Sequence, residues 1–298
     1  MAMLGSSALS KLFVGSTEVS KAYLGTTEIY SSTVEGILDL YGTPECAYSF
    51  RDLSGSRSAF NSIGDTGTQR SGIWVVQIRK TADDTQRSFT SAEVVDGTME
   101  TWVGSGDACV TTCYDQSSNA NHATQTVKTR QPGLVASGVL NTEGGLPAFA
   151  PDGVDDALNL GSVITGDAST FAVYRATIDN SPILRHLGGA AAAAAGRRSN
   201  GRYYYQTSAG TDGPATNHPS TQSAANYQMV GTAQSIHANN SLIASRTTTA
   251  NTANIGRLAT YSGQTAGGSM SEVIIYNTDK STDRSDIFTN MMDHYSIS

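Results

Sequence analysis

The sequence predicts an all-β protein that folds as an antiparallel β-sandwich, with a short helix near its C-terminus. Only 15 % of its 298 residues are charged and 30 are glycine, a composition that suits short strands joined by many turns. Strand signals recur between Gly, Asn, Ser and Asp clusters, without interleaved helical patterns. This order favours antiparallel sheets over alternating strands and helices. The clearest strands are expected at residues 73–79, 170–175, 227–232 and 272–276.

The strand at 73–79 shows the alternation on which this prediction depends. Trp74, Val76 and Ile78 share one face, whereas Gln77 and Arg79 share the other. Side chains alternate between the two faces of a strand, so one face is expected to be buried and the other polar.

The expected helix follows Ser281, Thr282 and Asp283. Ser281 or Thr282 is expected to cap it, and Asp283 suits its positive N-terminus. Five apolar residues then fall on one helical face and are interpreted as core: Ile287, Phe288, Met291, Met292 and Tyr295. The alanine run before Gly196 could form a helix, a loop or a thin strand, and the sequence does not decide among them.

A ten-residue repeat opens the chain. Residues 4–9, 14–19 and 24–29 align with one another, and each unit reads as a strand, a Gly-Ser/Thr turn and a second strand. Roughly 30 residues cannot bury a core of their own. We divide the chain into an anchoring arm, 1–32, and a sandwich domain, 33–298; the alternative is a hairpin packed on its own domain. The residues expected to anchor the arm are Leu4, Leu9, Phe13, Val14, Val19, Tyr23, Leu24 and Ile29.

The three cysteines, Cys46, Cys109 and Cys113, are interpreted as ordinary buried thiols. On a strand, Cys109 and Cys113 would lie about 13 Å apart on one face, too far for a disulfide. The histidine and cysteine spacings contain no zinc motif, so no cofactor is expected. Four oxygen-bearing side chains alternate along one segment: Asp115, Ser117, Asn119 and Asn121. A structural calcium site there remains an alternative, although a polar turn whose side chains bond its own backbone explains the pattern more simply.

Charge and hydropathy limit the classes of partner that the protein is expected to bind. The net charge of −7 argues against nucleic acid, and no apolar stretch is long enough to insert into a membrane. The first residues lack a secretory signal pattern. Arg202, Tyr203 and Tyr205 are a candidate contact for glycan or protein, whereas plain strand alternation is the alternative.

Several stretches resemble known families. Residues 113–125 resemble the YDQSGNGNHxTQ segment of the α-L-arabinofuranosidase B catalytic domain family. Further matches to that family's opening, and to concanavalin A/laminin-G-like sandwiches, lie at 47–51, 76–85, 149–158 and 271–277. The resemblance implies a jelly-roll, concanavalin A-like sandwich and hydrolysis of arabinofuranosides. The N-terminal Gly-Ser-Thr-Glu-Val repeat resembles the opening of many tailed-phage virion proteins.

The carboxyl groups that the family uses have no counterpart here. The family's nucleophile is a Glu and its acid an Asp, both in the second half of the domain, but between Asp179 and Glu272 the only acidic residue is Asp212. The region expected to carry the acid, residues 254–260, contains no carboxylate. No catalytic residue is therefore assigned. Another pair could be drawn from Asp115 and the acids of 152–156, although turn and capping roles explain these more simply.

These observations lead to a non-enzymatic hypothesis. We expect a phage virion structural protein on the exterior of the particle, assembled in the host cytoplasm, as a head decoration, a head fibre or a tail-appendage subunit such as a tail fibre. Its arm would contact other virion proteins, and it would form a homo-oligomer such as a trimer and bind cell-surface glycan. The alternatives are a glycoside hydrolase or depolymerase of arabinofuranosidase type and a free lectin.

Overall fold

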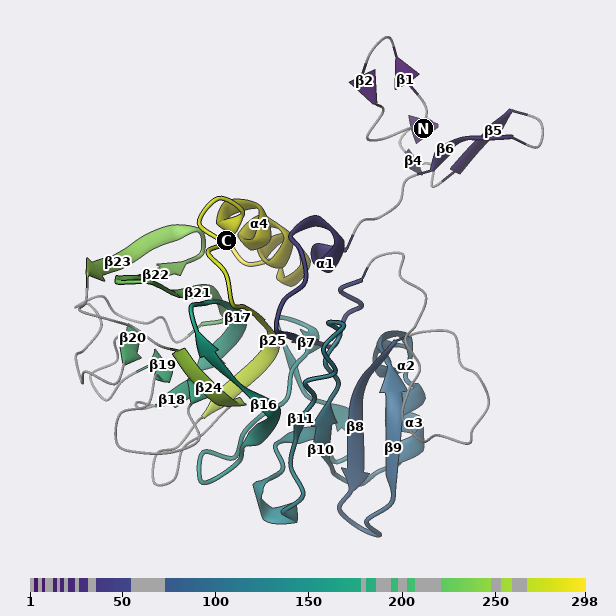
Figure 1. Ribbon diagram of the computed structural model, residues 1–298. Helices are drawn as coiled ribbons and strands as arrows, with labels where there is room; N and C mark the ends of the chain where they lie inside the picture. Colours follow the sequence, from purple (N-terminus) through teal and green to yellow (C-terminus); the bar gives the residue numbers. More distant parts are fainter. Residues whose placement is uncertain are drawn as a thin grey trace.

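Two large antiparallel sheets pack face to face in the computed structural model (Figure 1). The structure describes residues 3–4, 7–8, 13–14, 17–18, 21–24, 27–31, 36–54, 73–177, 181–185, 194–197, 203–206, 221–247, 253–258 and 267–298. Each pairing between these strands is antiparallel, and a helix lies near the C-terminus. The predicted fold class is therefore confirmed.

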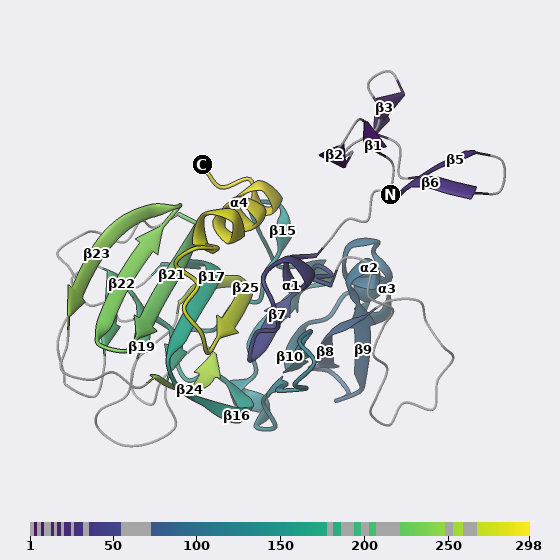
Figure 2. The same ribbon diagram turned by 45° about the horizontal axis from the view of Figure 1, so that its top comes forward.

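The first sheet has six strands in the order β23-β22-β21-β17-β25-β7, which Figure 2 shows side by side. Three of the predicted strands form its centre. The predicted strand at 227–232 ends early, because Gly231 takes a left-handed φ of +55° and begins the turn into the next strand. The bounds are β7 Cys46–Ser49, β17 Ala168–Ala176, β21 Ser223–Val230, β22 Ala233–Ala238, β23 Ser241–Thr247 and β25 Gly268–Tyr276.

The second sheet has eleven strands. Its main path is β13-β12-β10-β11-β16-β24-β18-β19-β20, and β8 joins β10 to β9. Within the alanine run, residues 194–197 form a strand. The bounds are β8 Trp74–Lys80, β9 Gln86–Thr90, β10 Ala108–Cys113, β11 Ala123–Thr124, β12 Gly133–Ala136, β13 Val139–Leu140, β16 Leu158–Gly166, β18 Ser181–Arg185, β19 Ala194–Arg197, β20 Tyr203–Gln206 and β24 Ala253–Leu258; a separate pair is β14 Thr142–Glu143 with β15 Leu146–Pro147.

The main core lies between the two sheets. Val76 and Ile78 of β8 point into it, as the alternation predicted, and Ala172 and Tyr174 of β17 meet them from the opposite sheet. The prediction is wrong for Trp74, which lies outside this core while Val75 belongs to it, because the register of β8 against β9 shifts between Trp74 and Val76. Phe171, in contrast, faces the other side of its sheet. Burying one large apolar side chain contributes about 1.5–3 kcal/mol, so such a central strand, buried on both faces, is a major source of stability.

The outer face of the six-stranded sheet is covered by two helices, α1 (Ile37–Leu40) and α4 (Arg284–Tyr295). The helix α4 lies over β21, β17 and β25, on the side of the sheet that faces the viewer in Figure 2. The predicted apolar face of α4 is confirmed, with Met292 only partly buried at its edge. The predicted cap is wrong, because Asp283 is the N-cap and its side chain makes no cap bond. Ser281 does not cap the helix and instead donates its hydroxyl to Asp279.

Like α1, two further short helices were not anticipated, α2 (Ser91–Val95) and α3 (Thr98–Val103), and a 3₁₀ turn, η1, spans Lys128–Arg130. They are too short for hydrophobic periodicity to reveal. A capping box does mark the first of them, since Thr90 and Glu93 bond each other's backbone N–H groups.

The predicted placement of the cysteines is partly wrong. Cys113 is buried in the main core, whereas Cys109 is partly exposed and lies outside it. The register of β10 against β8 shifts between Val110 and Thr112, which moves the two thiols onto different faces. All three cysteines are free.

Three short antiparallel pairs form at the N-terminus, with the spacing of the ten-residue units. They are β1 (Met3–Leu4) with β2 (Ser7–Ala8), β3 (Phe13–Val14) with β4 (Thr17–Glu18), and β5 (Lys21–Leu24) with β6 (Thr27–Ser31). The side chains of the eight predicted anchoring residues lie outside what the structure describes, so their role and the domain boundary stay predictions.

Candidate functional site

The segment that carries the family resemblance is a hydrogen-bonded structural clasp. Asp115 is buried, and its carboxylate accepts the backbone N–H groups of Ala47 (2.8 Å), Ser117 (2.9 Å) and Asn121 (2.8 Å) as well as the Ser117 hydroxyl (2.6 Å). Asn121 in turn bonds the backbone of Ser162 through both amide atoms. These are the bonds of a polar turn that ties the segment to neighbouring strands.

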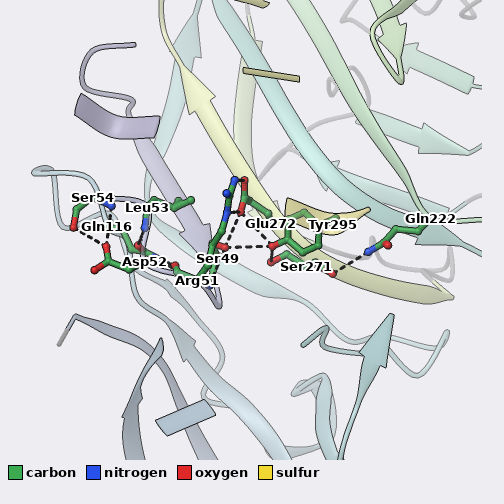
Figure 3. Close-up of polar contacts among 10 residues, drawn as sticks. All are labelled: Ser49, Arg51, Asp52, Leu53, Ser54, Gln116, Gln222, Ser271, Glu272 and Tyr295. Carbon is green, nitrogen blue, oxygen red and sulfur yellow. Dashed lines mark hydrogen bonds and ion pairs between the residues drawn. The ribbon is translucent and has the colours of Figure 1, made fainter. Parts of the chain in front are cut away.

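Gln116 extends the clasp toward the start of the domain. Its amide oxygen accepts the N–H of Leu53, and its amide nitrogen donates to the carbonyl groups of Ser49 and Arg51 (Figure 3). A buried amide with each polar atom bonded fixes the backbone against which it lies. Asp115 and Gln116 thus serve the fold. The carboxylate of Asp115 is already bonded within the chain, and Gln116 has no carboxyl group.

A buried ion pair lies beside this clasp. Glu272 of β25 is 1 % exposed and accepts two hydrogen bonds from Arg51, from Nε at 2.7 Å and Nη2 at 2.8 Å. The hydroxyl groups of Ser49 (2.8 Å) and Tyr295 (3.2 Å) also donate to it, as Figure 3 shows. The matching positive charge and four donors compensate the burial of this carboxylate. Burial, and then the charge of Glu272, raise the pKa of Tyr295.

The acidic turn, residues 152–156, differs from these sites because it lacks a buried cation. Asp156 is 3 % exposed, and one of its oxygens accepts the N–H of Asp152 at 2.7 Å. Burial, and then the charges of Asp152 and Asp155, raise the pKa of Asp156 to about 6. Asp152 Oδ1 accepts the N–H groups of Val154 (2.7 Å) and Asp155 (3.4 Å), so the expected turn-capping bonds are present.

Asp155 completes the acidic turn as a partly exposed carboxylate. Arg130 donates to it from Nε at 2.9 Å, and their side chains are 54 % and 40 % exposed. The turn therefore holds a carboxyl group with a raised pKa and an ion-paired carboxylate in one short segment. A carboxyl group with a raised pKa is typical of the acid partner in glycosidases. The sequence displays the acids, but the burial of Asp156 depends on long-range packing.

The acidic turn lies at a junction of three strands. Leu158, which follows it, pairs with Leu258 at the end of β24, and Asp152 bridges Gly267 before β25. The turn is thus brought beside the end of the segment, 254–260, in which the resemblance expects an acid. The sequence could not show that these segments are neighbours, because about 100 residues separate them.

The other predicted contact residues are not brought to the turn by any described interaction. Tyr203 and Tyr205 lie in β20 and pair with Arg197 and Ala195 of β19. Arg202 and Asp212 lie outside the described residues. Within the described ranges, no three His, Cys, Asp or Glu side chains are grouped as a metal site would require, and no helix is long and apolar enough to cross a membrane.

Comparison with solved structures identifies several similar folds. An arabinofuranosidase complexed with arabinofuranosyl-α-1,2-xylobiose matches 88 % of this chain with a TM-score of 0.58 and 16 % identity. Two GH54 α-L-arabinofuranosidase structures, one with a cyclic sulfate inhibitor and one with 4-nitrophenyl α-L-arabinofuranoside, match 85 % at TM-scores of 0.55 and 0.56, again at 16 % identity. The match covers 62–64 % of those chains. No protein-family model and no curated protein matches the sequence.

These comparisons correct the functional expectation. The hypothesis of a non-catalytic phage virion protein is wrong, as is the expectation that the chain is not an enzyme, because the three similar structures are glycosidases. Partners, cofactors and location stay predictions. The chain has the β-sandwich fold of the arabinofuranosidases, concanavalin A-like as the resemblance implied.

Proposed function

We propose that this chain is a glycoside hydrolase that acts on arabinofuranosyl-bearing glycans, with the acidic turn as its carboxyl site. The observation that carries the proposal is Asp156, whose pKa is raised to about 6 beside two further carboxyl groups. The likeness to arabinofuranosidases over 85–88 % of the chain supports the substrate class. Glycosidases need one protonated carboxyl group and one carboxylate flanking the scissile bond.

Each acid of the turn has a role in this proposal. Asp152 is exposed and shares a side-chain hydrogen bond with buried Asp156, so the pair holds a proton that Asp152 delivers to the leaving-group oxygen. Asp156 is a positioning residue, because it does not reach solvent. Asp155, ion-paired with Arg130, stabilises the positive sugar ring or attacks it.

The experiment measures release of 4-nitrophenol from 4-nitrophenyl α-L-arabinofuranoside by the full chain, together with sugar release from arabinoxylan. Asp152→Asn and Asp155→Asn should each lower kcat at least ~100-fold, the usual contribution of general acid–base catalysis. Asp293→Asn, an exposed acid on α4, is the matched control and should leave kcat unchanged. The rate of the wild type should fall as pH rises through about 6.

Two outcomes would contradict the proposal at different levels. If the wild type releases no sugar from either substrate, the hydrolase assignment fails. If it does and both turn variants keep full activity while Asp212→Asn loses it, the hydrolase assignment stands and the acidic turn is not its site. Circular dichroism of each variant confirms that the chain is folded.

A further inference from the structure

An open hollow lies on the outer face of the six-stranded sheet, away from the acidic turn. It has a volume of about 450 Å³ and is lined by residues from β21, β22 and β23 and by the segment before α4. The lining residues are Gln228, Ala233, Gln234, Ser235, Ser245, Thr247 and Ser281. This volume is within the range of small-ligand sites, roughly 300–1,000 Å³.

The hollow is formed by polar side chains in register across three strands. Gln228 pairs with Ser235, and Ser235 pairs with Ser245, so an amide and two hydroxyl groups follow one another across the sheet. Adjacent strands are ~4.8 Å apart, which sets the spacing of this row. α4 packs on β21 and on β17 and β25 beside it, whereas β22 and β23 lie beyond it in Figure 2.

Gln228 is held in place before any ligand arrives. Its amide nitrogen donates to Asp279 (2.6 Å) and Ser281 (2.8 Å), and its amide oxygen accepts from Arg284 at 3.1 Å. Gln228 is 7 % exposed. Both N–H groups of this amide are already used within the chain, so Gln228 fixes the floor of the hollow and offers a ligand one lone pair of its oxygen.

The lining chemistry selects one class of ligand. Of the lining residues that the structure describes, six are amides or alcohols, one is alanine and none is charged. Most small-molecule pockets are instead mainly apolar, and anion sites use Arg, Lys or helix N-termini. Amide and hydroxyl groups both donate and accept hydrogen bonds, as the hydroxyl groups of a neutral sugar do.

The hollow is far from the acidic turn. Gln228 pairs with Ser169, which pairs with Tyr276 at one end of β25, whereas Asp152 bridges Gly267 beyond the other end. Nine residues of extended chain at ~3.3 Å each separate those positions, or about 30 Å. A sugar unit in the hollow would therefore not be the unit attacked at the turn.

We propose that this hollow is a second, non-hydrolytic binding site for a neutral saccharide, which holds a remote part of a polysaccharide on the protein. Binding there needs no hydrolysis, so the proposal stands or fails apart from the acidic turn. A polymer held at two sites gains avidity without new contacts at the cleavage site.

The test uses Ser245→Trp, which fills the hollow from an exposed position on edge strand β23. The matched control is Leu242→Trp on the same strand, because Leu242 is 60 % exposed and does not line the hollow. Binding is measured by calorimetry with xylobiose and by retardation in native gels containing arabinoxylan. Ser245→Trp should weaken xylobiose binding at least ~10-fold and reduce retardation, while Leu242→Trp should match the wild type.

A milder variant guards against misfolding. Ser235→Ala removes one hydroxyl and should weaken xylobiose binding about 2- to 10-fold, the effect of one hydrogen bond. The proposal is overturned if the wild type binds neither probe, if Ser245→Trp keeps the wild-type affinity, or if Leu242→Trp weakens binding equally. Loss of binding in Asp155→Asn alone would place the saccharide at the acidic turn and also overturn it.

Discussion

Replacing Arg51 by methionine should destabilise the protein by about 3 kcal/mol, because it leaves Glu272 buried without its cation. The side chains of Arg51 and Glu272 are 17 % and 0 % exposed, so water replaces little of the lost interaction. Ser49 and Tyr295 would still donate to Glu272 but supply no charge. For a domain of this size, that loss corresponds to a fall in Tm of roughly 6–12 °C.

The double variant Arg51→Met/Glu272→Met provides the sharper test. Removing both charges removes the penalty of the orphaned carboxylate, so the double variant should be more stable than Arg51→Met alone. Urea unfolding at pH 7, followed by tryptophan fluorescence, measures both. Lys128→Met, which breaks the exposed pair of Lys128 with Asp84, is the control and should cost less than about 1 kcal/mol.

Two results would refute this reasoning. A loss below about 1 kcal/mol in Arg51→Met would mean that the pair behaves as an exposed one. A double variant as unstable as the sum of the two single variants would mean that Arg51 and Glu272 act independently. Adding 1 M salt should change the cost of Arg51→Met little, because buried pairs are weakly screened.

Three further predictions concern the acidic turn, a sheet glycine and the thiols. Because burial raises the pKa of Asp156 to about 6, the folded state holds this proton more tightly than the unfolded state. The free energy of unfolding should therefore fall as the pH rises from 4 to 7, and Asp156→Asn should flatten this dependence in urea titrations. Gly268→Ala should lower Tm strongly, because Gly268 has a φ of +131° and a Cβ there would lie 1.8 Å from the Arg175 carbonyl oxygen. Cys109, partly exposed, should react with a thiol reagent in the native state well before buried Cys113, whose pKa is raised to about 12, as mass spectrometry would show.

Matched controls accompany these three measurements. Gly42→Ala tests the cost of a positive φ alone, because Gly42 has a φ of +78° and nothing lies within 4 Å of an added Cβ. If Gly42→Ala lowers Tm as much as Gly268→Ala does, the contact with the Arg175 carbonyl oxygen is not the cause. Cys46 is buried and should react only on unfolding, like Cys113; native labelling of either would contradict the fold. Asp293→Asn should leave the pH dependence of stability unchanged.

The sandwich and the C-terminal helix could be predicted because their signals are local. The alternation of Val76 and Ile78 with Gln77 and Arg79 specifies a strand with one apolar face. The spacing of Ile287, Phe288 and Met291 likewise specifies one apolar helix face. Such periodicities follow from backbone geometry and need no knowledge of distant partners.

The sites depended on contacts that no local pattern contains. Arg51 and Glu272 meet although 221 residues separate them, and a bulge turned the thiols of β10 to different faces. Asp156 acquired its raised pKa only when packing removed it from water. The polar hollow likewise exists only because hairpins place Gln228, Ser235 and Ser245 side by side. The sequence alone therefore determined the layers and their faces, and tertiary packing decided which polar groups are buried, paired or left open to a ligand.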